Sequence, residues 1–171
     1  MGLFKLFKPK SPALPQQQTA AVPEASNAIP PIPVTNGCDL QAIYLYAKTD
    51  FEARGYQDAL TNPDTAYKNE NISLLLEDLD IQIKQAQNYY AARLIKLDFH
   101  IASRKAAGLI DTVKELENQK TIIVQQQTEV QQIIKDKTEG LGLVKRITLS
   151  YNRGFNRGLA SISYNLLNPN S

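Results

Sequence analysis

The sequence predicts an all-α protein built on a long coiled-coil helix or an antiparallel helical hairpin, with a short N-terminal helix and a disordered Pro-rich N-terminal linker. Three observations support this fold class. Residues 71–139 contain no proline and one glycine, and Leu, Ala, Lys, Glu and Gln dominate them, all of which favour helix. Their apolar residues recur at three- and four-residue steps, which is typical of a helix with one apolar face. Residues 9–35 hold seven of the nine prolines.

Residues 1–8 form a short amphipathic basic peptide. Its apolar and basic side chains are Leu3, Phe4, Lys5, Leu6, Phe7 and Lys8. This composition fits an interfacial helix on an anionic membrane, or a groove on a partner protein. About two turns of helix are marginal alone, so stable attachment needs several copies, which an oligomer supplies. Membrane contact, partner docking and the absence of a role therefore stay as three alternatives.

Residues 9–35 are predicted to be a disordered Pro/Gln/Ala-rich linker. Prolines at this density interrupt both helices and strands, and the segment has little apolar surface to bury. Its expected role is to hold residues 1–8 away from the folded part. Docking of Pro30–Pro33 into an aromatic groove is the less favoured alternative.

Residues 36–139 are predicted to form the helical coiled-coil domain, which begins with a helix over residues 39–60. Leu40, Ile43, Ala47 and Phe51 follow a helical period there. Asn36-Gly37 is a turn signal before this helix, and Asn62-Pro63-Asp64 is a stop signal after it.

The main helical region is predicted to start at Asn71 as its N-cap, and it carries two apolar seams. The first seam includes Leu76, Leu79, Ile83, Tyr90 and Leu97. The second begins at Ala102 and Ala106 and continues with Leu109, Val113, Leu116, Ile123, Val130, Ile134 and Leu141. Four-three spacing sustained over this length predicts that these residues pair with another helix, either of the same chain or of another subunit.

The two seams are out of phase by one residue between Ile101 and Ala102, a rotation of about 100°. Together with Gly108, this break favours a chain that folds back as a hairpin. The alanines nearby and the absence of proline favour one continuous helix that changes partners midway. The sequence leaves both arrangements open.

Residues 140–171 are predicted to be a basic amphipathic C-terminal segment, set off by Gly140-Leu141-Gly142. An apolar stripe over residues 143–166 favours a helix. Alternation on both sides of a Gly- and Asn-containing stretch allows a β-hairpin instead. The segment carries four bases and no acid, namely Lys145, Arg146, Arg153 and Arg157, which are candidate contacts for an anion or a partner. Four positive charges are few for nucleic acid, so that class of partner is not expected.

The sequence offers no set of catalytic or metal-ligating residues. His100 and Cys38 are the only histidine and the only cysteine, and neither is part of a zinc motif or a nucleophile–base pair. No cofactor is expected, because no glycine-rich phosphate loop is present. One cysteine allows no internal disulfide, and no apolar run reaches the roughly 18 residues of a membrane span. The expected location is cytoplasmic, with membrane association or a virion as alternatives.

These observations lead to a functional prediction. The chain is expected to be a non-enzymatic coiled-coil assembly or adaptor protein that forms homo-oligomers or binds another helical protein, and docks other components through its ends. A peripheral membrane protein that uses residues 1–8 is the first alternative, and a nucleic-acid-binding protein that uses the basic C-terminal segment is the second. The Asn-, Gln-, Lys- and Ile-rich composition suggests a bacterial or phage origin.

Overall fold

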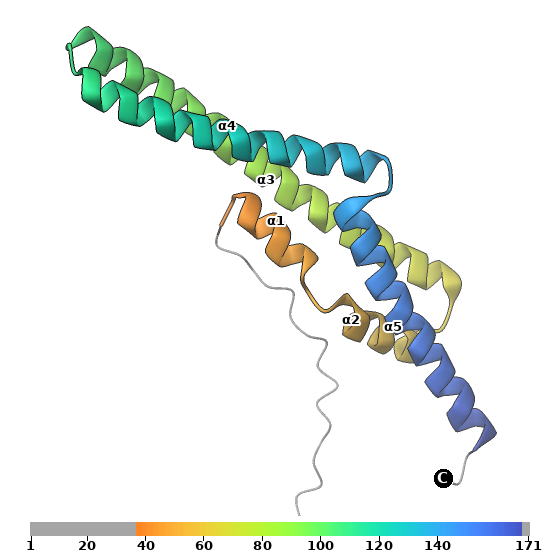
Figure 1. The fold of residues 1–171 in the computed structure, drawn as a ribbon. Helices are drawn as coiled ribbons and strands as arrows, with labels where there is room; N and C mark the ends of the chain where they lie inside the picture. Colours follow the sequence, from red (N-terminus) through yellow and green to blue (C-terminus); the bar gives the residue numbers. More distant parts are fainter. Residues whose placement is uncertain (1–36, 169–171) are drawn as a thin grey trace, which may run out of the picture.

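The computed structural model describes residues 37–168, which form five helices and no strand. They are α1 (Leu40–Ala47), α2 (Phe51–Thr61), α3 (Thr65–Ala106), α4 (Ile110–Thr138) and α5 (Gly142–Leu167). α3 and α4 lie side by side as an antiparallel hairpin, and α5 runs on from the end of α4, away from the α3–α4 turn, and packs against α2 (Figure 1). The predicted all-α class is confirmed, while the peptide 1–8 and the linker 9–35 lie outside the described residues.

The chain folds back between α3 and α4, so the hairpin is the correct one of the two predicted arrangements. Gly108 follows the end of α3 with φ +74°, a left-handed conformation that only glycine adopts without strain. The Leu109 N–H donates to the Arg104 carbonyl at 3.0 Å, and the Gly108 N–H donates to the Lys105 carbonyl at 3.1 Å. These two bonds form a Schellman motif, which satisfies carbonyls that the helix end leaves open.

The predicted start of the main helix at Asn71 is wrong, because α3 begins two turns earlier. The Asp64 carboxylate accepts hydrogen bonds from the backbone N–H groups of Ala66 and Tyr67, and it is therefore the N-cap. Asn71 lies inside the helix, where its side-chain amide donates to the Tyr67 carbonyl at 3.0 Å. The predicted stop at residues 62–64 is confirmed.

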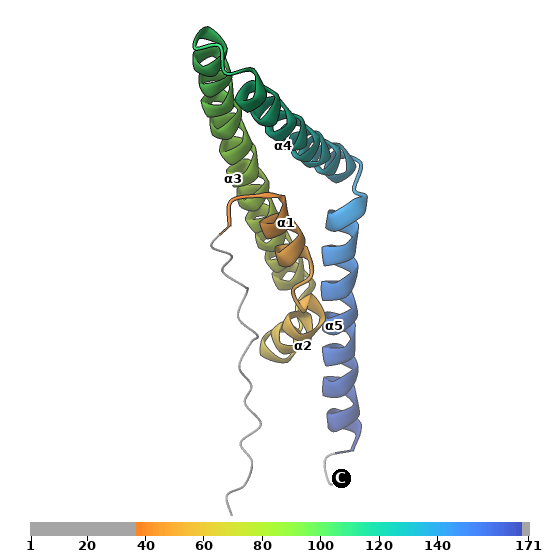
Figure 2. The same ribbon diagram turned by 60° about the vertical axis from the view of Figure 1, so that its left-hand side comes forward.

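The single helix predicted for residues 39–60 is wrong as well, because the chain breaks after Ala47. The Asp50 carboxylate accepts a hydrogen bond from the Ala53 N–H at 3.0 Å and caps α2. Asp39 caps α1 in the same way, through the Ala42 N–H. Two cap residues 11 positions apart produce two short helices that point in different directions (Figure 2).

The C-terminal segment is a helix, so the β-hairpin alternative is wrong. α5 crosses α2 at very short range, and glycines permit this. A Cβ atom on Gly154 would lie 1.8 Å from the Glu52 carbonyl oxygen, and one on Gly55 would lie 2.2 Å from the Tyr151 carbonyl oxygen. The glycines that weaken the helical signal in the sequence are thus the residues that let the two helices touch.

The core lies where α1, α2 and α5 cover the base of the hairpin, which is the end where α3 begins and α4 ends. Its most deeply buried side chains are Ile43, Phe51, Leu75, Leu79, Tyr90, Val130, Ile147, Tyr151 and Phe155. The core also contains one buried carboxylate, Asp58, which accepts a 2.8 Å hydrogen bond from the Tyr151 hydroxyl. Burial and this bond raise the pKa of Tyr151.

Candidate interaction surface

Hydrogen bonds of three tyrosines join α1 to the hairpin and mark how far the core extends. The Tyr46 hydroxyl donates to the Leu75 carbonyl at 2.7 Å. Further along, the Tyr44 hydroxyl donates to Glu129 on α4. The Tyr90 hydroxyl accepts from the Leu40 N–H at 3.0 Å, at the first residue of α1. Because α1 begins there, we take Tyr90 and Glu129 as the limit of the covered part of the hairpin.

Beyond that limit the hairpin continues as two helices alone, and we call residues 91–128 the arm. Figures 1 and 2 both show the arm projecting away from α1, α2 and α5. Within the arm only Leu97 and Ile123 are buried. Lys120 and Asp98 form an ion pair across it at 2.7 Å. Two helices bury one stripe on each, so the other faces of the arm stay open to solvent.

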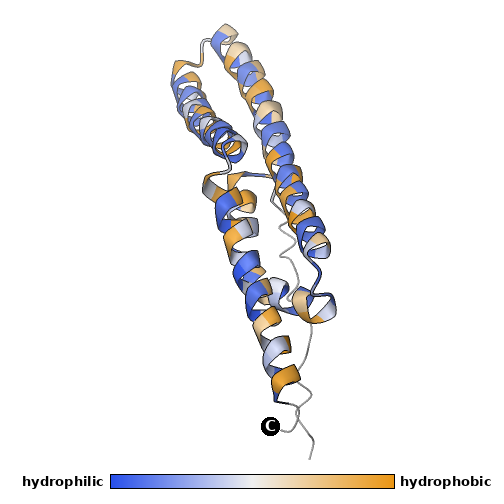
Figure 3. Cartoon of the chain, turned by 90° about the vertical axis from the view of Figure 1, so that its right-hand side faces the viewer, coloured by the Kyte–Doolittle hydropathy of each residue, from blue (hydrophilic) through white to orange (hydrophobic). Residues whose placement is uncertain are grey.

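The arm therefore exposes large apolar side chains. Ile95, Phe99 and Ile110 are 71%, 69% and 68% exposed. Leu109, Ile122 and Val124 are also exposed, and Figure 3 shows hydrophobic residues interleaved with hydrophilic ones along both helices of the hairpin. Single exposed apolar residues are ordinary on protein surfaces, whereas apolar residues that adjoin on one face are typical of an interaction site.

The predicted seam residues lie in three environments. Leu79, Ile83, Tyr90, Leu97, Ile123 and Val130 are buried. A second group is half-buried, and consists of Leu76, Val113, Leu116 and Ile134. Leu109 and Leu141 lie in the two turns that follow α3 and α4, and they are about half exposed. Most of the seam thus pairs within the chain, which leaves its role between subunits a prediction.

The apparent phase break in the sequence has a simple cause in the structure. The sequence periodicity predicts Ala102 and Ala106 at the start of the second seam, yet both are exposed on the last turns of α3. Because the chain reverses at Gly108, the α4 stripe starts afresh at Val113. The alanines belong to a different face of α3, together with Ile95 and Phe99. Sequence reasoning did not single out those two residues, although their four-residue spacing was a usable signal.

The four C-terminal bases are placed on α5, and three of them contact other residues of the chain. The Arg146 Nε donates to the Ala47 carbonyl at 3.0 Å, at the end of α1. Arg153 and Arg157 both pair with the carboxylate of Glu52 on α2. Lys145 is exposed. These contacts join α5 to α1 and α2, and contact with an anion or partner stays a prediction.

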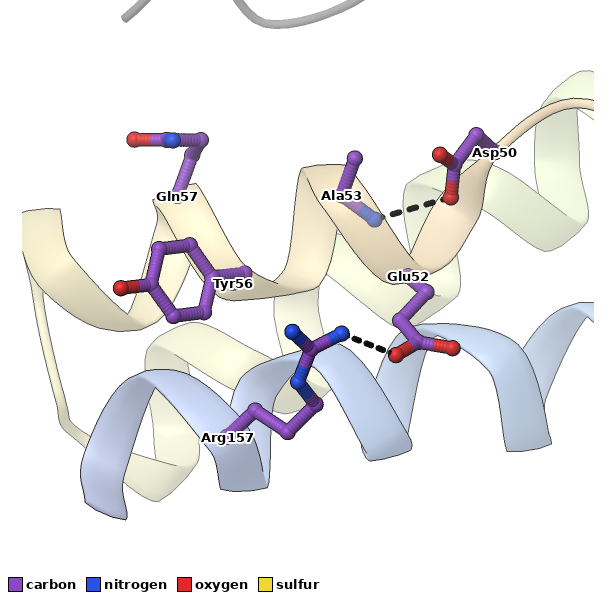
Figure 4. Close-up of a pocket in the computed structure, with 6 residues that line it drawn as sticks. All are labelled: Asp50, Glu52, Ala53, Tyr56, Gln57 and Arg157. Atoms are coloured by element: carbon purple, nitrogen blue, oxygen red, sulfur yellow. Dashed lines mark hydrogen bonds and ion pairs between the residues drawn. The ribbon is translucent and has the colours of Figure 1, made fainter. Parts of the chain in front are cut away.

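A shallow cleft lies between α2 and α5 (Figure 4). It is lined by Asp50, Glu52, Ala53, Tyr56, Gln57 and Arg157. The Arg157 guanidinium pairs with Glu52 and lies 6.0 Å from the centre of the Tyr56 ring. The Asp50 carboxylate caps α2. The charged groups of the cleft are thus engaged with one another or with backbone, as expected for a helix–helix contact.

The remaining candidates for chemistry are solvent-facing. His100 and Cys38 are both exposed. Within residues 37–168, no three His, Cys, Asp or Glu side chains cluster closely enough to hold a metal ion. No helix in that range combines the length and apolar character of a membrane span. The predicted docking residues of the peptide 1–8 lie outside the described range.

Comparisons of the chain with protein-family models, curated proteins and solved structures found no match. A functional assignment therefore depends on the chain's own residues.

Proposed function

We propose that the chain is a non-enzymatic assembly protein whose helical hairpin associates, in coiled-coil fashion, with helices of other copies of the chain or of another protein. The α5 segment and the peptide 1–8 are the parts proposed to dock further components. The observation that carries the proposal is the arm, which projects about 24 Å from the last α1 contact at 1.5 Å per residue and exposes Ile95 and Phe99 by about 70%.

The energetics of the arm support an intermolecular role. Complete burial of a side chain such as Ile or Phe stabilises an assembly by about 1.5–3 kcal/mol. The arm holds six large apolar residues that the chain itself leaves exposed. A second helix laid along one face of the arm gives the apolar residues on that face a partner, since helices with a broad apolar surface need more than one neighbour.

The ionisable groups give additional support to a structural role. Among residues 37–168, the groups with clearly shifted pKa are the tyrosines Tyr44, Tyr46, Tyr90 and Tyr151, and each shift is upward. Burial or a hydrogen bond to a carboxylate is the main cause in every case. An ordinary tyrosine is already protonated at neutral pH. The upward pKa shifts extend this to higher pH, so the hydroxyls of Tyr44, Tyr46 and Tyr151 keep donating their hydrogen bonds there.

The test is the mass and shape of the full chain in solution, by light scattering combined with small-angle X-ray scattering over a concentration series. We expect the mass to rise from 19.1 kDa towards a multiple of that value, with an elongated particle. A chain that stays monomeric at high concentration, and that captures no helical partner protein in a pull-down, contradicts the proposal.

A further inference from the structure

One face of α3 within the arm carries apolar side chains at alternating three- and four-residue steps. We call these residues the outer stripe, and they are Ala92, Ile95, Phe99, Ala102 and Ala106. All five are exposed in the isolated chain. The stripe runs about 21 Å along the helix, at 1.5 Å per residue.

The outer stripe lies on the side of α3 that faces away from α4. An α-helix turns by about 100° per residue, so all five residues fall within about 40° of the direction opposite Leu97. Leu97 is the buried residue of α3 in the seam with α4. α4 has no comparable stripe, because its exposed Ile110, Ile122 and Val124 do not fall on one line at this period.

From this pattern we infer that the outer stripe binds the outer stripe of a second copy, with the two α3 helices antiparallel about a two-fold axis near His100 and Ile101. In a two-fold contact the same surface serves both copies, and residues pair reciprocally. The inference rests on the proposed function, since it names the surface and the partner of that assembly.

Side-chain size supports the antiparallel arrangement. In this register Phe99 faces Ala102 of the second copy, and Ile95 faces Ala106 of the second copy. Each pair occurs twice because of the two-fold axis. Large residues opposite small ones allow two helices to interdigitate without voids or overlaps. A parallel arrangement would instead stack Phe99 on Phe99 and leave alanine opposite alanine.

Charge supports the same arrangement. Asp98 and Lys105 flank the outer stripe on the same side. In the antiparallel register, Asp98 of each copy lies next to Lys105 of the other copy. Asp98 is 56% exposed at its side chain and already holds Lys120 through one carboxylate oxygen, which leaves the second oxygen for Lys105. On the opposite side, Lys96 faces Ser103, so no like charges meet. In the parallel register Asp98 faces Ser103 and gains no ion pair.

The shape of the molecule leaves room for this contact. α1, α2 and α5 lie around the base of the hairpin, away from the tip (Figure 2). An antiparallel overlap confined to the arms places the two bases at opposite ends of the dimer, where they do not collide. A contact of about four turns is small compared with interfaces of stable dimers, so we expect dimerisation to be reversible and concentration-dependent.

The first test compares full-length variants by sedimentation equilibrium. Phe99→Glu and Ile95→Glu place a charge in the centre of the stripe, and we expect each to weaken dimerisation by about thirtyfold or more, as for an interface hot spot. Ile122→Glu is the matched control on α4, an exposed aliphatic residue of the same arm, and it should leave dimerisation unchanged. Circular dichroism checks that all three variants keep the helical content of the wild type.

The second test fixes the orientation by disulfide trapping in a Cys38→Ser background, which removes the exposed native thiol. Ile95→Cys and Ala106→Cys are made as separate chains of different tag length, mixed and oxidised. The antiparallel register predicts that the mixed disulfide between the two variants predominates. A parallel register predicts disulfides within each variant, 95 to 95 and 106 to 106.

The outcomes separate this inference from the proposed function. Loss of the dimer in Phe99→Glu together with the mixed disulfide supports the antiparallel stripe. Self-association that survives Phe99→Glu and Ile95→Glu overturns the inference and leaves the assembly function standing on another surface. Disulfides within each variant overturn the orientation. A wild type that is monomeric throughout overturns the inference and removes self-association from the proposed function.

Discussion

At the scale of single residues, the close contact between α2 and α5 depends on glycines, which have no Cβ atom. Gly55 and Gly154 each lie where a Cβ would meet a backbone carbonyl oxygen of the other helix, and Gly158 lies where it would meet Ala59 at 2.6 Å. Backbone atoms cannot move aside as flexible side chains do. Any larger residue at these positions therefore pushes the two helices apart and disturbs the packing of Tyr151 and Phe155 around them.

Gly154→Ala tests this packing, because the close crossing predicts a lower free energy of unfolding where an ordinary helix would show a higher one. In an ordinary exposed helix, Ala in place of Gly stabilises by about 1 kcal/mol. Here we expect destabilisation by about 1–3 kcal/mol, because the added methyl overlaps the Glu52 carbonyl. Urea unfolding followed by circular dichroism measures the change. Asn156→Ala, an exposed position on α5, is the control, and a stabilised Gly154→Ala would contradict the close crossing.

The tyrosine hydroxyls predict how stability depends on alkaline pH. The hydrogen bond to Glu129 raises the pKa of Tyr44 from 10.0 to about 12, and burial raises the pKa of Tyr46 and Tyr151. A tyrosine whose pKa is higher when folded favours the folded state below its unfolded pKa. That contribution is lost as the pH rises from about 10 towards 12.

Tyr44→Phe isolates this effect. We expect the wild type to be more stable than the variant near pH 8, and this difference to shrink as the pH is raised above about 10. The measurement is the free energy of unfolding in urea for both proteins across that range. Tyr164→Phe, at an exposed position, is the control. A difference between wild type and Tyr44→Phe that stays constant with pH would show that the folded and unfolded pKa of Tyr44 are the same.

At the scale of helices, N-cap residues explain why two helix boundaries differ from those predicted from the sequence. Asp50 and Asp64 accept hydrogen bonds from N–H groups two and three residues ahead. Asp is a common N-cap residue, so both positions were possible helix starts. The apolar periodicity that continues through residues 47–51 nevertheless favoured a single helix over residues 39–60. The long helical region and the break at Gly140 could be predicted, because composition and periodicity extend over many residues there. The fold-back near Gly108 was one of two arrangements that the sequence left open.

The partner of each apolar stripe could not be predicted in the same way. Periodicity shows that a face is apolar, but it does not show whether the covering helix comes from the same chain. Leu79 and Val130 are buried inside the hairpin, whereas Ile95 and Phe99 have a similar spacing and stay exposed. The difference arises from where α1 begins to cover the hairpin and where the chain turns, and both are properties of the folded molecule.

Gly108 gives a test of the turn itself. Its φ of +74° lies in the left-handed region, and nothing lies within 4 Å of where a Cβ would be. The cost of Gly108→Ala is therefore backbone strain alone, about 1–2 kcal/mol. Gly108→Asn should cost less, because Asn tolerates this conformation. Unfolding free energies of the two variants provide the comparison, and a Gly108→Ala variant more stable than wild type would indicate a continuous helix instead of a turn.

At the scale of the whole molecule, the membrane alternative predicts a result that the assembly proposal does not. The assembly proposal leads us to expect that the full chain does not co-sediment with vesicles of anionic lipid. Co-sedimentation that is lost in Phe4→Glu/Phe7→Glu would favour the membrane alternative, because those residues form the apolar part of the peptide 1–8. Leu166→Glu, at the exposed end of α5, is the control that tests whether another apolar surface is responsible.

The whole molecule also has an uneven distribution of buried apolar surface, which predicts uneven stability. Around the base of the hairpin, Leu75 and Leu79 of α3 and Val130 of α4 are fully buried in the core. The arm buries only Leu97 and Ile123, each still 7% exposed. Segments with few buried contacts open locally at lower free energy than the core.

Hydrogen exchange measured by mass spectrometry tests this gradient at a concentration where the chain is monomeric. We expect amides of residues 95–104 and 113–122 to exchange faster than those of residues 74–88 and 145–156, because only the latter need disruption of the core to open. Raising the concentration should then slow exchange in residues 92–106 more than in α4, if two outer stripes pair. Equal protection along all of α3 in the monomer would mean that the hairpin opens as one cooperative unit, and the arm would then owe its order to the base of the molecule.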